Sequence, residues 1–468
     1  MGRRDMAVRR RRFLTAASAL TVGLTGCLRL TSDEGATPTT GERDATAETD
    51  RTAVDEPTAT DATETEALVS IETVGTERVE QIFVGPRNRM YQRGVTAPTS
   101  EPRRGIARQL DVPYYGRLGR GPLLDGERLF LNPDPRTLVA LSRADGSVVW
   151  NFSETSTDAY PLPRLVALYE ETVVVVGDNR RTDETDVVGI ETDTGREAWQ
   201  AALPLGEEEY VSAAKRAGDT VVVCTDESLD GDGGSHIYAV DLVEKAVAWE
   251  SQLAATAVTP EDVAVTTERA FITTDEAPDG EPNVVAFDLD AQERLWDATL
   301  DIGEAVPTVD ERHLYLPVTT GDVGGHLIAF SQEDGSESWR FEQRGLPRTG
   351  VSTDGENVYT VGSARLYALS ATDGSVVWSY VDEASSSISG NSSTMPVVTE
   401  NLLLTGADAG SDDGAAIRAI DTSSGDRRWQ HRVPHSSVTS PMIADGVLWT
   451  IGFDRQDDSA TLYALGEE

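Results

Sequence analysis

Cysteine and histidine are scarce in this sequence, and several motifs of enzyme active sites are missing. The 468 residues include two cysteines, Cys27 and Cys224, so no framework of disulfides can hold the fold. The five histidines include no H-E-x-x-H motif, and Pro434 keeps His431 and His435 off a common helical face. The chain also has no G-x-S-x-G nucleophile elbow and no Walker-type phosphate loop. We therefore predict no catalytic residue.

Basic residues are outnumbered by acidic ones. The chain has 80 Asp and Glu against 40 Lys and Arg, a formal net charge of −40, and its only lysines are Lys215 and Lys245. Such a charge repels nucleic acid and anionic membrane surfaces, so neither is expected as a partner. The acidic, lysine-poor composition resembles that of haloarchaeal secreted proteins, where it serves solubility at high salt.

The N-terminal apolar stretch is too short to cross a bilayer core of ~30 Å, because it runs only from Phe13 to Thr25. It overlaps a sequence that resembles a twin-arginine export motif, formed by Arg10, Arg11, Phe13 and Leu14. It ends in Leu-Thr-Gly-Cys, which resembles a lipobox. Residues 1–27 are therefore predicted to be a signal peptide, with Cys27 as the lipid-carrying first mature residue. This predicts a protein anchored at the cell surface, on the outer face of the cytoplasmic membrane.

The rest of the chain divides by composition into a tether, a lead-in segment and a repetitive region. Residues 28–66 are rich in Thr, Ala, Asp and Glu with few large apolar residues, so we expect a disordered acidic tether. Residues 67–104 are expected to form a partly irregular lead-in segment. Residues 105–468 are repetitive, and 105–112 are predicted to form a strand that pairs with the last repeat. That pairing would cover an otherwise exposed sheet edge.

One thirteen-residue pattern recurs seven times and begins an eighth time. Its clearest copy, 366–378, reads LYALSATDGSVVW, which indicates a strand, a turn at Asp373-Gly374 and a second strand. The third position is always small, at Ala140, Gly189, Ala239, Ala286, Ala329, Ala368, Ala419 and Ala464. The thirteenth is tryptophan, at Trp150, Trp199, Trp249, Trp296, Trp339, Trp378 and Trp429. Lys245 and Gln292 replace the turn glycine in two copies, where a different or strained turn is expected.

The spacing of these tryptophans predicts the fold. They lie 39 to 51 residues apart, and the segments between them carry strand signals only, which is typical of radial β-arrays. Four strands per repeat and eight repeats predict an all-β fold, an eight-bladed β-propeller of four-stranded antiparallel blades closed by an N-terminal strand. The tryptophans are interpreted as structural wedges that lock adjacent blades together over the small residues.

The repeated pattern, with its small residue, Asp/Thr-Gly turn and tryptophan, resembles the tryptophan-docking motif of the pyrroloquinoline quinone (PQQ) repeat family. That family includes quinoprotein alcohol dehydrogenases and BamB-type assembly lipoproteins. The resemblance implies for a dehydrogenase an adjacent-cysteine disulfide, an Asp base and a Glu/Asn/Asp calcium site. This chain offers only Cys27 and Cys224, and Cys224 lies in an apolar strand where it is interpreted as a small buried side chain. No cofactor is therefore expected, and neither is PQQ with calcium.

Long acidic loops between second and third strands are expected to gather at one end of the ring. One of them contains Asp230 and Asp232, a weak candidate for a metal site that lacks the Glu of an EF-hand. The favoured function is a non-catalytic binding or scaffold protein, with an envelope protein or a small ligand as partner. Two alternatives stay open, a PQQ-dependent oxidoreductase and a sugar- or ion-binding accessory protein.

Overall fold

In a computed structural model of the chain, the residues described are 78–81, 87–110, 122–134, 137–152, 164–179, 184–206, 209–227, 234–254, 260–274, 283–300, 305–320, 324–344, 350–361, 365–381, 395–407, 414–454 and 459–466. The predicted signal peptide, the tether and the loop with Asp230 and Asp232 lie outside these residues. All of the described residues belong to the unit Glu66–Glu468.

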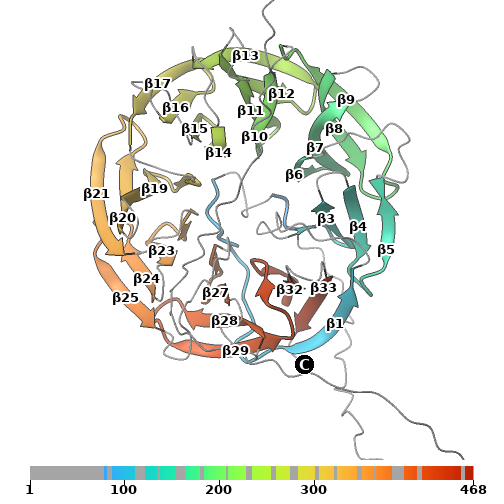
Figure 1. Ribbon diagram of the computed structural model, residues 1–468, viewed down its shortest axis with the longest axis vertical. Coiled ribbons are helices and arrows are strands. Elements are labelled where there is room, and N and C mark those ends of the chain that lie inside the picture. Colours follow the sequence, from blue (N-terminus) through green and yellow to red (C-terminus); the bar gives the residue numbers. More distant parts are fainter. Residues whose placement is uncertain are drawn as a thin grey trace, which may run out of the picture. The chain divides into compact units, whose positions relative to one another are not determined.

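Seven blades follow one another along the chain, and each is an antiparallel sheet whose four strands run in order from the axis to the rim (Figure 1). Blades 1 to 3 contain β2 (Leu123–Leu124), β3 (Arg128–Asp134), β4 (Thr137–Ser142) and β5 (Val148–Asn151); β6 (Arg164–Tyr169), β7 (Thr172–Asn179), β8 (Glu184–Glu191) and β9 (Glu197–Leu203); and β10 (Glu209–Ala217), β11 (Thr220–Glu227), β12 (Ser235–Asp241) and β13 (Ala246–Ala254). Blades 4 and 5 contain β14 (Pro260–Val265), β15 (Arg269–Thr274), β16 (Val284–Asp288) and β17 (Glu293–Ala298); and β18 (Thr308–Val309), β19 (His313–Thr320), β20 (Gly324–Ser331) and β21 (Glu337–Arg344). Blades 6 and 7 contain β22 (Ser352–Thr353), β23 (Asn357–Val361), β24 (Arg365–Ser370) and β25 (Val376–Val381); and β26 (Val397–Val398), β27 (Leu402–Ala407), β28 (Ala415–Asp421) and β29 (Arg427–Val433).

The eighth blade joins the two ends of the described chain. It contains β30 (Ser437–Val438), β31 (Met442–Ala444), β32 (Val447–Asp454), β33 (Ser459–Gly466) and, outermost, β1 (Arg103–Gln109). β1 pairs antiparallel with β33, from Arg103 opposite Gly466 to Gln109 opposite Thr461. The predicted eight-bladed propeller closed by an N-terminal strand is therefore confirmed, with the closing strand at 103–109 rather than 105–112.

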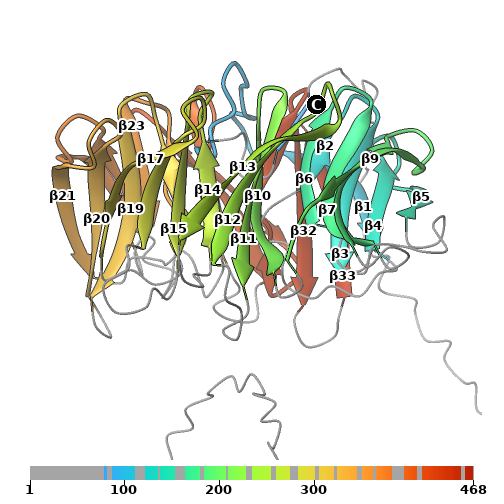
Figure 2. The ribbon, with the colours of Figure 1, turned by 90° about the horizontal axis from the view of Figure 1, so that it is seen from above.

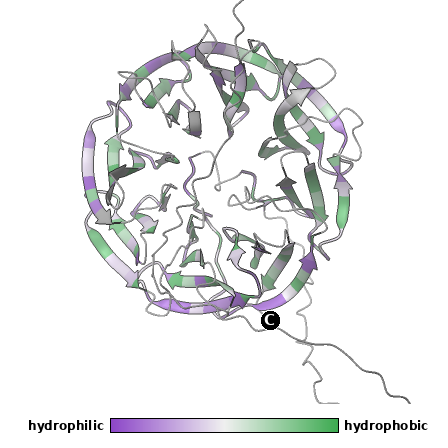
Figure 3. Cartoon of the chain, viewed as in Figure 1, coloured by the Kyte–Doolittle hydropathy of each residue, from purple (hydrophilic) through white to green (hydrophobic). Residues whose placement is uncertain are grey.

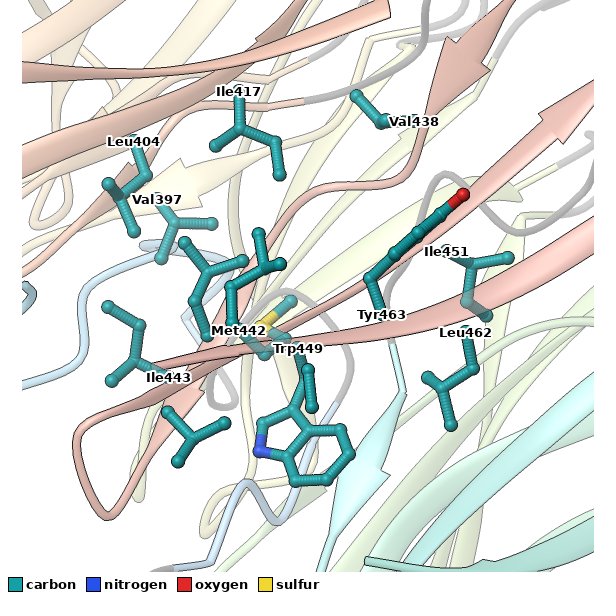
Figure 4. Close-up of a cluster of buried hydrophobic side chains, with 14 of the residues drawn as sticks. Val397, Leu404, Ile417, Val438, Met442, Ile443, Trp449, Ile451, Leu462 and Tyr463 are labelled. Carbon is teal, nitrogen blue, oxygen red and sulfur yellow. The ribbon is translucent and has the colours of Figure 1, made fainter. Parts of the chain in front are cut away.

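The apolar core lies between neighbouring blades. Second strands are the most apolar, because both of their faces are covered; Val173 to Val176 of β7 are all buried. Figure 4 shows one such cluster, in which side chains of blades 7 and 8 meet around Met442 and Trp449. Val79 and Met90 from the lead-in segment belong to the same cluster.

A bulge recurs in the outer strand of every blade. The pairing of third and fourth strands shifts register immediately before the tryptophan, so that one extra residue, such as Val377 in blade 6, has no partner. In blade 8 the extra residue is Gly105, and Ile106 takes the position of the tryptophan. Because bulges increase twist and interrupt the edge, they protect the rim from edge-to-edge pairing.

Candidate functional site

The small residues of the repeat lie beside the tryptophans within each blade. Ala368 of β24 is opposite Trp378 of β25, and the same register holds for Ala140, Gly189, Ala239, Ala286, Ala329 and Ala419 with their tryptophans. A Cβ on Gly189 would lie 2.1 Å from Trp199 Nε1, so a side chain of ordinary size cannot be placed under the indole. Ala464 of blade 8 pairs instead with Ile106 and Trp449.

Each well-docked tryptophan also reaches the next blade. Trp339 of blade 5 covers Gly374, where a Cβ would lie 2.5 Å from its ring, and its Nε1 donates to Ala371 O at 3.0 Å. Trp150, Trp296 and Trp378 donate in the same way to the carbonyls of Thr192, Gln332 and Thr422. The indole covers the turn of the next blade, so each such tryptophan connects neighbouring sheets by a hydrogen bond and by apolar contact.

Trp199 and Trp249 depart from this arrangement. They face the turns in which Lys245 and Gln292 replace glycine, at φ 56 and 59, and both indoles are only half-buried. Within the described part of the chain neither indole N–H has an acceptor. Trp249 instead stacks on Phe287 of blade 4, with ring centroids 5.9 Å apart and planes at 17°. The two turns keep the left-handed backbone of the others at the cost of some strain.

The lead-in segment crosses one end of the ring, where it contacts the inner strands. We call its described residues, 78–81 and 87–97, the strap; it runs through the middle of the ring in Figure 1 and along one end in Figure 2. Its carbonyls accept from the inner strands: Leu124 N bonds Val79 O at 3.0 Å, Val309 N bonds Arg87 O at 3.0 Å and Val398 N bonds Met90 O at 2.7 Å.

These contacts form a regular pattern around the axis. The amides of Leu124, Leu168, Val309, Thr353, Val398 and Ile443 occupy the same position in six blades, immediately before the turn from first to second strand, and all six donate to the strap. Inner strands expose unpaired edge amides toward the axis. The strap supplies acceptors for these amides and thereby satisfies a polar edge that would otherwise need water.

Side chains extend the strap to the two remaining blades. Arg216 of blade 3 pairs with Glu80. Asn88 Nδ2 donates to Val263 O of blade 4 at 3.1 Å and to Pro307 O at 2.9 Å. Asn88 is fully buried, and it has φ 54, a left-handed conformation that asparagine tolerates better than most residues. The strap thus contacts every blade.

Arginines on the strap meet carboxylates on the ring. Arg87 and Arg89 pair with Glu311 at 2.9 and 2.6 Å. Burial raises the pKa of Glu311, but hydrogen bonds and charge from the two guanidiniums outweigh it and leave the pKa below its ordinary value. From its sequence this segment is predicted only as a lead-in, and none of these contacts is predicted. The cluster of arginines in so acidic a chain is the signal that could have indicated it.

A polar cluster lies at the other end of blade 3. Glu209 begins β10, seven residues before Arg216 and so roughly 23 Å from the strap end of that strand. Its side chain is 6% exposed and accepts hydrogen bonds from the hydroxyls of Thr225 and Tyr238, while His236 Nδ1 lies 3.0 Å from Oε1. The neighbouring Tyr210 is 48% exposed and donates to Asp226. Burial, assisted by this bond, raises the pKa of Tyr210 to about 12.

A second imidazole is held by a carboxylate at the same end of blade 8. His435 Nδ1 lies 2.8 Å from Asp454 Oδ2, and the Ser436 amide donates to Oδ1 at 2.6 Å. Burial raises the pKa of Asp454, but these partners outweigh it and hold the pKa below its ordinary value. Both imidazoles are therefore oriented through Nδ1.

The described residues lack a cluster of metal-ligand side chains. No three His, Cys, Asp or Glu side chains among them converge to hold a metal ion. Cys224 is fully buried, and burial raises the pKa of its thiol, so it is an inert core side chain. The sequence-predicted residues Arg10, Arg11, Phe13, Leu14, Cys27, Asp230 and Asp232 are outside the described residues. Where the chain is described, it contains no helix long and apolar enough to span a bilayer.

The fold and its docked tryptophans define an eight-bladed β-propeller built from PQQ-like repeats. Residues 38–240 and 233–467 match the family described as outer membrane protein assembly factor BamB, and the chain belongs to this family. No curated protein sequence matches the chain significantly.

Solved structures resemble the chain in fold alone. The quinohemoprotein alcohol dehydrogenase from Comamonas testosteroni is 11% identical, with a TM-score of 0.61 over 84% of this chain and 81% of its own. A europium-containing methanol dehydrogenase is 12% identical, with a TM-score of 0.58 over 84% and 98%. BamB from Moraxella catarrhalis is 14% identical over 76% and 98%, and its TM-score of 0.46 is too low to support an inference.

Proposed function

We propose that this protein is an exported, lipid-anchored propeller that binds an envelope protein or a small ligand at the cell surface and catalyses no reaction. The observation that carries the proposal is the strap. Its acceptors already occupy the edge amides of the inner strands at one end of the axis, so the opposite end is the one left to bind a partner.

The end of the ring away from the strap is the proposed binding end. It presents the exposed ring of Tyr210 and the half-buried imidazole of His236, whereas the imidazole of His435 beside Asp454 is only 9% exposed. Tyrosine anchored through its hydroxyl offers a rigid aromatic surface at little entropic cost, which is a common property of binding hot spots.

A photo-crosslinking experiment in native membranes tests the proposal. A photoreactive residue at position 210 should capture a specific partner, identified by mass spectrometry, whereas one at exposed Glu356, in a turn at the strap end of blade 6, should not. Equal capture at both positions, or none at either, would contradict a partner at this end. Thermal melts with candidate solutes at constant salt test the small-ligand alternative, since a bound ligand raises the melting temperature.

Cys27→Ser tests the anchor separately. We expect the variant to be released from the membrane fraction while the unchanged chain stays with it. Retention of the variant would show that a lipid at Cys27 is not the anchor.

Quinoprotein chemistry is the rival function, because two of the similar structures are dehydrogenases. Incubation with PQQ and calcium separates the two functions. We expect no bound quinone absorption and no alcohol-dependent dye reduction. A stoichiometric quinone band would overturn the non-catalytic proposal.

A further inference from the structure

The outer strands of blades 7 and 8 are basic, in contrast with the rest of the ring. β29 (RRWQHRV) and β1 (RRGIARQ) have seven residues each, with three arginines each and no Asp or Glu. Of the other outer strands, β9 and β13 have one acidic residue each, and β17 and β21 have two each. Arginine occurs once on β17 and twice on β21, while β5 and β25 carry no charge.

The two basic strands are neighbours on the rim. Trp429 of β29 donates through Nε1 to Pro98 O at 2.7 Å, and His431 Nδ1 lies 3.5 Å from Glu101, just before β1. Figure 1 draws β29 and β1 next to each other at the lower edge of the ring, and Figure 3 colours both largely hydrophilic. We call these two strands the basic rim.

Three arginines of the basic rim form no ion pair with a described residue, although Asp145 is near enough to Arg108 to interact with its charge. Arg428 pairs with Asp421 at 2.7 Å. Arg427 donates only to uncharged groups, Tyr380 Oη at 3.5 Å and Gln430 Oε1 at 3.1 Å. Within the described ranges, Arg108, Arg427 and Arg432 have no carboxylate at ion-pair distance, and all three are exposed. The chain has twice as many acidic as basic residues, so a local surplus of positive charge is unexpected and favours the binding of an external anion.

We propose that the basic rim, contrary to the expectation from the net charge of the whole chain, binds phosphate headgroups of an anionic bilayer, so that the ring lies with this edge toward the membrane. The proposal rests on the lipid anchor at Cys27, which would hold the rim close to the surface. Guanidinium groups bind phosphate through two parallel hydrogen bonds. The remaining negative charge of the ring is screened beyond a Debye length of about 8 Å at physiological salt. A basic patch is also one of the second signals that make lipid anchoring stable.

Vesicle binding of the full chain with Cys27→Ser, which removes the anchor, tests the rim by itself. The vesicles are phosphatidylglycerol mixed equally with phosphatidylcholine, compared with phosphatidylcholine alone. We expect binding to the anionic vesicles only. The triple variant Arg108→Gln, Arg427→Gln, Arg432→Gln should weaken it about 100-fold, since each arginine near an anionic surface contributes about fivefold.

A matched control removes the same charge from another part of the ring. Arg294→Gln, Arg340→Gln and Arg365→Gln on blades 4, 5 and 6 should leave binding within about twofold, with unchanged melting temperatures for both triples. Equal losses of vesicle affinity in both triple variants would show that binding depends on net charge alone, and would overturn the proposal. Equal binding to neutral and anionic vesicles, or no binding to either, would overturn it too. Because Cys27 is absent, these outcomes are independent of whether the anchor exists.

Discussion

At the scale of single residues, a turn glycine and an indole share the space between two blades. A Cβ on Gly374 (φ +70) would lie 2.5 Å from Trp339, whereas one on Gly446 (φ +74) would meet nothing within 4 Å. Alanine at either position must adopt the left-handed conformation, which costs roughly 1 kcal/mol. We expect Gly374→Ala to lower the free energy of unfolding by about 2 kcal/mol more than Gly446→Ala, because it also displaces the indole. Denaturant titrations measure both; equal losses would leave turn conformation as the sole reason for glycine.

The tryptophans themselves should differ in importance. Trp339 is 7% exposed and bonds the next blade, so Trp339→Ala should lower the free energy of unfolding by about 3–5 kcal/mol. Trp249 is half-buried, and no acceptor for its indole was found in the described chain, so Trp249→Ala should lose less than half as much. Denaturant titrations of both variants measure the two losses. A loss for Trp249→Ala as large as that for Trp339→Ala, or larger, would contradict the difference in docking.

At the scale of elements, the strap is held at its centre by Asn88. Asn88→Ala removes two buried hydrogen bonds and puts alanine in a left-handed conformation, so the strap should loosen by about 2–3 kcal/mol. Hydrogen exchange measures the effect. The amides of Val309 and Thr353 donate to Arg87 and Arg89, on either side of Asn88, and should exchange faster. Amides of β20 in the same blade are the internal control, and unchanged exchange at Val309 would mean that Asn88 does not secure the strap.

The blades and the strap differ in how well sequence predicts them. The two outer strands of blade 6 are predicted from the sequence within a few residues, because each is encoded locally by β-branched and aromatic residues beside a turn glycine. The closing strand was predicted because the last repeat lacks a partner. The strap binds through its own carbonyls to amides such as Val309 and Val398, more than 200 residues away, and backbone groups leave no pattern in a sequence. Tyr210, His236 and His435 were missed as a group because only the ring brings blades 3 and 8 to the same end.

At the scale of the whole molecule, a buried ion pair joins the first blade to the last. Arg143 of blade 1 is 1% exposed; it donates to Asp125 O at 2.7 Å and to Asp445 Oδ2 of blade 8 at 2.9 Å. Asp445→Asn keeps the shape of the side chain and the left-handed backbone but removes the negative charge that Asp445 places beside the Arg143 guanidinium. We expect the free energy of unfolding to fall by about 3–5 kcal/mol, measured by denaturant titration. In a double-mutant cycle, Arg143→Met should recover part of the loss; strict additivity would contradict the pairing.

The ring should also lose stability at alkaline pH. Burial first, and then hydrogen bonding to Asp226, raises the pKa of Tyr210 from 10.0 to about 12. A pKa that is higher in the folded state contributes stability that is fully present below the pKa of the unfolded chain and is lost as pH rises through the pKa of the folded chain. The contribution of Tyr210 should therefore be lost between about pH 10 and about pH 12. Denaturant titrations across this pH range should show a free energy of unfolding that depends less on pH for Tyr210→Phe than for the unchanged chain. The same pH dependence in both proteins would mean that Tyr210 does not contribute to the loss of stability.

The pairing of β1 with β33 has a consequence for biosynthesis. A ribosome releases Arg103 more than 350 residues before Gly466, its partner across the sheet. Throughout that interval the nascent chain must carry an unsatisfied strand and an unfinished circle of sheets. The circle therefore cannot be sealed until β33 has been synthesised, and any machinery that exports this protein in folded form has to wait for that strand.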